Sequence, residues 1–165
     1  MIFVTVGTAA RGIEFTRLIE AMDRIAGDLG VDVLIQRGLS DYEPQHARHV
    51  RFVKYDEALE LFRTCDFVVG HCGSGTVLNG LRFAKPMILV PRRIDQGELD
   101  ADDHQMQLAR QVETMPGVTL VYDMADLEPA VRRYVEHRPP GSSPTPARAS
   151  LIGAIRQFIA GAPRP

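Results

Sequence analysis

Residues 67–83 read FVVGHCGSGTVLNGLRF, and this stretch decides the fold of the chain. The apolar run predicts a buried strand, a glycine-bearing turn follows it at residues 71–76, and a helical segment begins near Val77. The first N–H groups of such a helix have no partner within the helix, so they point at the turn and favour a phosphate. The other interpretation is an ordinary strand-to-helix turn, in which Ser74 or Thr76 caps the helix.

The rest of the chain alternates strands and helices. Short apolar strands are expected at residues 2–6, 31–35, 50–53, 66–70, 87–90 and 118–121. Segments with apolar residues at helical spacing lie between most of them. This pattern is typical of a parallel sheet with helices on both faces, so we expect an α/β fold with a doubly wound, mainly parallel, Rossmann-like sheet. In such a sheet ligands bind beyond the carboxyl ends of the strands.

The sequence divides into three parts. Residues 1–137 carry the strand and helix pattern, residues 138–146 are rich in Pro, Ser and Gly and predict a linker, and residues 147–165 predict a C-terminal helix and tail. That helix has a narrow apolar stripe, which would pack on the domain, dock a partner or form a homodimer. The stripe consists of Leu151, Ile152, Ile155, Phe158 and Ile159.

Composition excludes several classes of protein. The net charge of −2 gives no bulk attraction to nucleic acid, so we expect no nucleic-acid partner. The apolar start of the chain is too short for a signal or transmembrane segment. The two cysteines form no CxxC pair, which argues against a disulfide framework or a zinc site and fits a reducing cytosol.

Common cofactor motifs are absent from the sequence. It has no GxGxxG after the first strand, no GxxxxGK[ST] and no GxSxG, so we expect no NAD, P-loop or nucleophile-elbow chemistry, and no cofactor. The second distinctive segment, residues 97–105, reads GELDADDHQ. Asp102 suits a helix cap, whereas His104 and Gln105 could reach the same ligand edge as the turn. No second histidine stands at ligand spacing from His104, so no metal is expected.

Together these segments resemble the C-terminal domain of glycosyltransferase family 28, the nucleotide-sugar half of GT-B glycosyltransferases. The resemblance rests on residues 71–76, 84–86 (AKP), 90–91 (VP) and 102–105 (DDHQ), and it covers roughly the first 135 residues. The chain looks most like the type that occurs as a separate subunit. Such subunits include the catalytic subunit of the two-part N-acetylglucosamine transferase of N-glycan lipid synthesis and bacterial exopolysaccharide counterparts.

This resemblance implies a site for a UDP-sugar. Lys54 and Tyr55 stand where relatives hold the nucleobase, and Asn79 stands where relatives often carry an acid that binds the ribose. The implied residues are Gly7 and Thr8 lining the cleft, His71, Gly73, Ser74, Gly75 and Thr76 at the diphosphate, Asn79 at the ribose, and Asp103, His104 and Gln105 at the transferred sugar.

The resemblance also implies an inverting hexosyltransferase that moves a sugar from a UDP-sugar to a polyprenyl-linked glycan in polysaccharide biosynthesis. In relatives the general base and the acceptor surface belong largely to a further domain that 165 residues cannot include. A membrane-anchored partner subunit would then supply both and hold the lipid-linked acceptor. The chain would be cytoplasmic and peripheral at the inner face of the membrane. The alternative is a non-catalytic nucleotide-sugar-binding or regulatory module.

Overall fold

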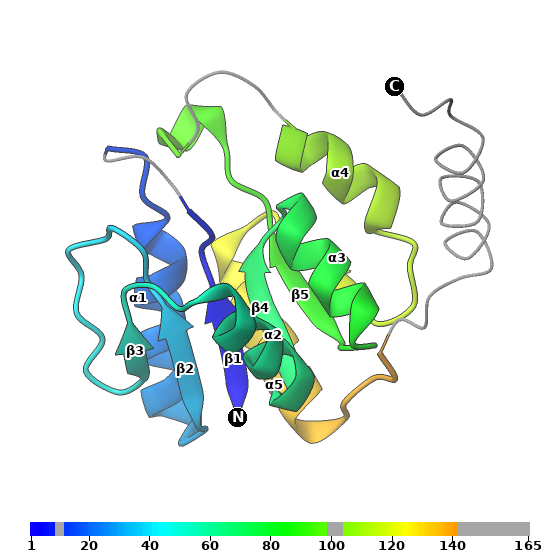
Figure 1. Cartoon of the computed structure of the whole chain (residues 1–165), viewed down its shortest axis with the longest axis horizontal. Helices are drawn as coiled ribbons and strands as arrows, with labels where there is room; N and C mark the ends of the chain where they lie inside the picture. The colour runs from blue at the N-terminus through cyan, green and yellow to red at the C-terminus, as the bar shows by residue number, and fades with distance from the viewer. Residues whose placement is uncertain (9–11, 99–103, 142–165) are drawn as a thin grey trace, which may run out of the picture.

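The computed structural model describes residues 1–8, 12–98 and 104–141, and in this part the strands form one sheet (Figure 1). The sheet has six parallel strands in the order β3-β2-β1-β4-β5-β6. The prediction of a doubly wound α/β fold is therefore confirmed. The strands are β1 (Ile2–Thr5), β2 (Val33–Gln36), β3 (Arg48–Val50), β4 (Phe67–His71), β5 (Met87–Val90) and β6 (Val118–Leu120).

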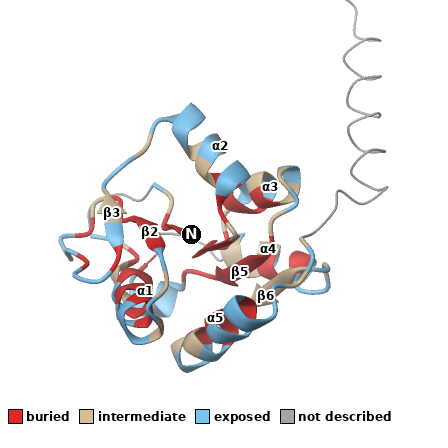
Figure 2. Cartoon of the chain, turned by 90° about the horizontal axis from the view of Figure 1, so that it is seen from below, coloured by how far each residue is buried: buried red, intermediate tan, exposed pale blue. Residues whose placement is uncertain are grey.

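Helices cover both faces of the sheet. The α-helices are α1 (Thr16–Leu29), α2 (Tyr55–Thr64), α3 (Ser74–Arg82), α4 (His104–Val112) and α5 (Leu127–Glu136), with short 3-10 turns at η1 (Ile94–Gln96) and η2 (Met124–Asp126). Helices α1 and α5 lie on one face, and α2, α3 and α4 on the other (Figure 2).

The two faces give two hydrophobic cores because successive strand residues point to opposite sides. Val4 and Val69 join the core beneath α1 and α5, whereas Phe3 and Val68 join the core beneath α2, α3 and α4. All four residues of β1 and of β5 are buried. Covering both faces explains why β5 is apolar along its whole length, and β1 from Ile2 to Val4, instead of alternating.

The prediction for the third strand was wrong in position. It was expected at residues 50–53, but β3 ends at Val50, and Phe52 beyond it is exposed. Beyond β3, the Arg51 carbonyl accepts hydrogen bonds from the Gly38 N–H at 2.9 Å and from Gln36 Nε2 at 3.3 Å. An edge strand has a weak apolar pattern because one side of it faces solvent, so sequence alone places it poorly.

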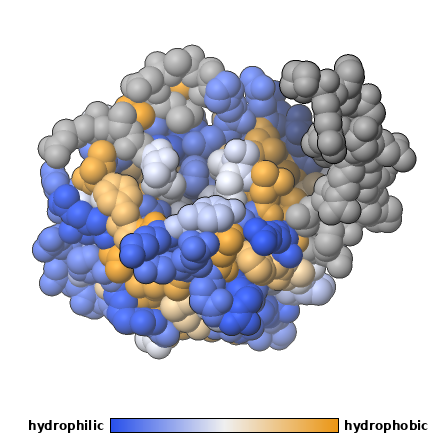
Figure 3. All heavy atoms as spheres, in the orientation of Figure 1, coloured by the Kyte–Doolittle hydropathy of each residue, from blue (hydrophilic) through white to orange (hydrophobic). Residues whose placement is uncertain are grey.

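Large hydrophobic side chains that remain exposed follow the carboxyl ends of several strands. Phe52 and Tyr55 come after β3, Ile94 after β5 and Tyr122 after β6, while Leu78 lies on α3. Hydrophobic side chains accordingly interrupt the hydrophilic surface in the view of Figure 3.

The latter part of the predicted linker and the C-terminal helix, with its apolar stripe, lie outside the described residues, which end at residue 141. Within the described part, no helix is long and apolar enough to cross a membrane.

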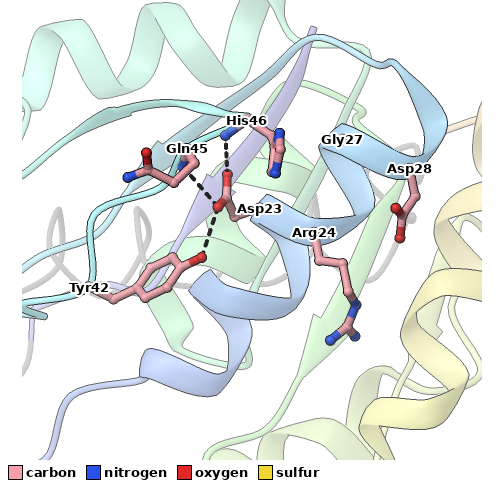
Figure 4. A pocket seen from close by; sticks show the side chains of 7 residues that line it. All are labelled: Asp23, Arg24, Gly27, Asp28, Tyr42, Gln45 and His46. Atoms are coloured by element: carbon pink, nitrogen blue, oxygen red, sulfur yellow. Dashed lines mark hydrogen bonds between the residues drawn. The ribbon is translucent and has the colours of Figure 1, made fainter.

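The connection between β2 and β3 is fastened to α1 by one carboxylate. Asp23 on α1 is only 1% exposed, and its two oxygens accept four hydrogen bonds of 2.8–2.9 Å. Figure 4 shows those from Tyr42, Gln45 and His46. The donors are the Tyr42 hydroxyl and the backbone N–H groups of Gln45, His46 and Ala47.

These hydrogen bonds also set the charge of Asp23. Burial raises the pKa of the Asp23 carboxyl, but its hydrogen bonds outweigh this effect, so the pKa lies below its ordinary value. A cavity of about 340 Å³ opens beside this cluster. Both oxygens of its central carboxylate are already used, so we assign the cluster to stability and not to ligand binding.

Asp23→Asn should destabilise the fold. The amide NH₂ would face N–H donors, and lost hydrogen bonds to a charged group would lower the free energy of unfolding by about 2–4 kcal/mol. Urea unfolding at pH 7 measures this change. The control is Asp28→Asn at an exposed position on the same helix, which should unfold within about 0.5 kcal/mol of the wild type.

Acid should reveal the same interaction. Because the native pKa of Asp23 is lowered, its stabilisation is complete above the unfolded pKa of about 4 and disappears as pH falls through the native value. Between pH 5 and pH 3, Asp23→Asn should therefore lose less stability than the wild type, as measured by urea unfolding at each pH. Equal urea midpoints for the wild type and Asp23→Asn would contradict the assignment.

Candidate functional site at the carboxyl edge of the sheet

A crevice is expected between β1 and β4, where the order of the strands reverses. β1 pairs with β2 on one side and with β4 on the other, so the loops after β1 and β4 lead away in opposite directions. Gly7 follows β1, His71 ends β4, and α3 begins three residues later at Ser74. The structure thus brings the loop after β1 and the turn at residues 71–76 together.

The His71 ring is packed between two glycines. A Cβ atom at Gly7 would lie 2.5 Å from ring atoms Cε1 and Nε2, and one at Gly73 would lie 2.3 Å from Nε2. Gly7 also has a φ of +70°, which a residue with a side chain rarely adopts. Gly73 is therefore needed for the ring, and it does not take a positive φ.

The other ring nitrogen faces the protein. Nδ1 of His71 lies 3.4 Å from the Thr5 carbonyl oxygen and 3.2 Å from Thr76 Oγ1. When the Thr76 hydroxyl donates to Nδ1, the ring proton is on Nε2, at the edge that faces Gly7 and Gly73. Thr76 is itself buried, so its hydroxyl would act on a ligand through His71.

His71 is neutral at physiological pH. Burial lowers its pKa to about 4, the positive charge of Arg92 acts in the same direction, and the hydrogen bond that a protonated Nδ1 would donate to the Thr5 carbonyl opposes both. The ring can therefore serve as a hydrogen-bond donor without carrying a charge.

The first turn of α3 is open. Its N-cap is Gly73, which makes no side-chain cap, so the interpretation with Ser74 or Thr76 as the cap is wrong. Ser74 and Gly75 are exposed, and a Cβ atom at Gly75 would meet nothing within 4 Å. The unpaired N–H groups and the positive end of the helix dipole therefore face an accessible space.

Gln105, on the first turn of α4, reaches toward this edge from the side of β5. Its Oε1 accepts a hydrogen bond of 3.1 Å from the backbone N–H of Arg92. That bond leaves the Nε2 amide as a donor, and it has no hydrogen-bond partner among the described residues.

The remaining predicted residues are placed as follows. Asn79 is half-buried on α3, Thr8 is exposed after β1, and His104 is the exposed first residue of α4. Asp103 lies outside the described residues. Lys54 precedes α2, and Tyr55 is the first residue of that helix and is 68% exposed.

The sequence placed Arg92 at this edge and Glu98 in the second distinctive segment, but it did not predict that both charged side chains are buried. Arg92 follows β5 and is 3% exposed, and Glu98 is buried nearby. Glu98 accepts a hydrogen bond of 2.5 Å from Arg17 Nε and one of 3.0 Å from the Arg93 N–H, which joins the start of α1 to the segment after β5. Arg92 follows the buried strand β5 closely, but charged residues are normally expected at the surface.

Metal and thiol chemistry have little support in the described part of the chain. There, no three His, Cys, Asp or Glu side chains are grouped so that they could hold a metal ion. Cys65 and Cys72 are buried, and burial raises the pKa of each thiol to about 11, so neither is a thiolate at neutral pH.

Comparison with known proteins gives both a family and a fold. The family model of the glycosyltransferase family 28 C-terminal domain matches residues 1–144. The solution structure of ALG13 is similar, with a TM-score of 0.58 and 18% identity over 93% of this chain and 93% of that one. No curated protein matches the sequence.

Two larger enzymes share the fold. UDP-GlcNAc 2-epimerase from Methanocaldococcus jannaschii, solved with UDP-GlcNAc and UDP, has a TM-score of 0.59 and 12% identity over 95% of this chain and 45% of its own. Glycosyltransferase VinC, solved with DTDP, has a TM-score of 0.52 and 18% identity over 98% of this chain and 38% of its own. The chain thus spans less than half of either enzyme, and identities this low establish the fold alone.

The family match extends over nearly all of the sheet and helices described above. The chain therefore belongs to the glycosyltransferase family 28 C-terminal domain family.

Proposed function

We propose that this chain binds a UDP-sugar and is one half of an inverting glycosyltransferase. The observation that carries the proposal is the open first turn of α3 beside the neutral His71 ring, at the crevice between β1 and β4. Family membership supports the choice of a nucleotide-sugar. The complexes of the epimerase with UDP and of VinC with DTDP are consistent with a nucleoside diphosphate as the common ligand.

In the proposed reaction, the bond between the sugar C1 and the diphosphate oxygen breaks, and its electron pair stays on the diphosphate. The acceptor hydroxyl oxygen bonds to C1 from the opposite face and gives its proton to a base. Negative charge grows on the diphosphate, where the amides of Ser74 and Gly75 and the Nε2–H of His71 would donate hydrogen bonds. These groups are fixed before the reaction, so they need little reorganisation during it.

We assign binding of the donor's sugar to residues at the start of α4. Gln105 presents its Nε2 donor because Oε1 is held by the Arg92 N–H at 3.1 Å. We assign this amide to a hydroxyl of the transferred sugar, with Asp103 and His104 as further contacts, and Asn79 to the ribose. Gly7 and Thr8 would line the cleft opposite α3, and Lys54 and Tyr55 would meet the nucleobase.

A second chain would complete the enzyme. We propose that a membrane-anchored subunit supplies the general base and a lipid-linked glycan acceptor, and that the product serves polysaccharide biosynthesis. The exposed side chains of Phe52, Tyr55 and Leu78 near the carboxyl edge support a surface that is covered in the complex. This chain would then lie at the inner face of the membrane through its partner.

Ser74→Asp tests the diphosphate site. A carboxylate on the first turn of α3 should repel the diphosphate and weaken UDP binding about tenfold or more, measured by titration calorimetry or ligand-observed NMR. The same charge should leave the stability of the fold unchanged or raise it by about 0.3–1 kcal/mol, because it complements the helix dipole.

Ser74→Asn is the matched control, since it has the same shape without the charge. It should bind UDP within about threefold of the wild type. Equal UDP affinity for the Asp and Asn variants would rule out a diphosphate at this turn.

Acid titration tests the state of His71. Its NMR signals, assigned by their loss in His71→Gln, should show no midpoint between pH 5.5 and pH 8, in line with a pKa of about 4. Because the native pKa lies below the unfolded value of about 6.5, neutral His71 contributes fully to stability above pH 6.5.

This contribution should fall as pH drops from 6.5 toward 4, by up to about 3 kcal/mol at 1.36 kcal/mol per pKa unit. His71→Gln should show a flatter stability profile across this window. A His71 midpoint near pH 6.5 would contradict the neutral, buried ring.

Turnover distinguishes an enzyme from a non-catalytic module. The chain alone should transfer little sugar from a UDP-sugar to a lipid acceptor, and addition of the partner or a membrane fraction should restore transfer. In the assembled complex, Gln105→Ala should lower turnover while assembly stays intact. Unaltered turnover would favour the regulatory module instead, and robust transfer by the lone chain would overturn the two-chain proposal.

A further inference from the structure

Arg92 fastens both ends of the loop that follows β1. Its side chain is buried, and its guanidinium donates to the Val6 carbonyl at 2.6 Å and to the Ile13 carbonyl at 3.5 Å. Its Cζ also lies 5.4 Å from the centre of the Phe15 ring. Gly7 directly follows Val6 and lies against the His71 ring, so we expect the position of Gly7 and Thr8 to depend on Arg92.

The backbone of Arg92 holds a second part of the site. Its N–H donates to Gln105 Oε1 at 3.1 Å and so orients the amide at the start of α4. One residue therefore contacts both the loop after β1, near the diphosphate end, and the amide assigned to the sugar end.

The guanidinium of Arg92 is held by neutral backbone groups. Its hydrogen-bond acceptors among the described residues are carbonyls and not carboxylates, and its buried Nε has no partner there. Glu98 and Glu14 attract it through their charges, and both oxygens of Glu98 are engaged by Arg17 and by the Arg93 N–H. Its positive charge is felt at His71.

We propose that Arg92 is a positioning residue for the donor: it fixes the loop of Gly7 and Thr8 and the amide of Gln105, and it supplies buried positive charge next to the diphosphate site. This inference rests on the proposed function. Because the side chain is buried, Arg92 acts through these neighbours and through its charge, without touching the ligand.

The two roles predict different effects for two variants. Arg92→Met removes the charge and both hydrogen bonds to the loop, and it should weaken UDP binding about tenfold. Arg92→Lys keeps the charge but lacks the fork that reaches two carbonyls. It should weaken binding about threefold and shift the backbone amide NMR signals of Gly7 and Thr8.

The control is Arg24→Met, the same substitution at an exposed position on α1. It should leave UDP binding and the His71 titration unchanged. Each variant is made in the full chain, and its folding is checked by thermal unfolding. The His71 titration separates the charge of Arg92 from its shape, because the midpoint should rise in Arg92→Met, which lacks the charge, and stay low in Arg92→Lys, which keeps it.

The outcomes separate this inference from the proposed function. Failure of the wild-type chain to bind UDP would overturn the proposed function, and this inference with it. Normal wild-type binding together with binding within twofold in both folded Arg92 variants, and an unmoved His71 midpoint, would overturn this inference alone. If Arg92→Met does not fold, wild-type UDP affinity and unshifted Gly7 and Thr8 signals in Arg92→Lys would overturn it equally.

Discussion

The parallel pairing of β1 with β4 is the constraint on which the site depends. Thr5 pairs with Gly70, and a Cβ atom at Gly70 would lie 2.8 Å from the Thr5 carbonyl oxygen, so only glycine permits the two strands to approach this closely. The same carbonyl lies 3.4 Å from Nδ1 of His71, the next residue of β4. The pairing of β1 with β4 thus helps to fix the position and orientation of the His71 ring at the edge of the sheet.

Much of this arrangement could be predicted from the sequence because it follows from local patterns. Continuous apolar runs predicted the buried strands. The glycine-bearing turn at the end of β4 predicted the start of the helix that lies at the crevice. The reason for the glycines differed in part from the expectation. Gly73 makes room for the His71 ring, whereas Gly75 borders open space.

The parts that could not be predicted depend on contacts between distant segments. Arg92 is buried because the Val6 and Ile13 carbonyls, about 80 residues earlier, lie where its guanidinium can reach them. Local composition carries no trace of such a contact. Likewise, β3 pairs with β2 through Arg48, His49 and Val50, and not through the apolar residues that follow Arg51.

The donor side alone leaves one requirement of glycosyl transfer unmet. A sugar moving between two oxygens must be shielded from water, which would otherwise compete as the acceptor. Ser74 and Gly75 are exposed, as is Leu78 one turn further along α3, so the proposed diphosphate site is open to solvent. In the proposed enzyme, the surface that closes this site and the base that receives the acceptor proton come from the same second chain. Transfer would then begin only after the two chains meet across the donor.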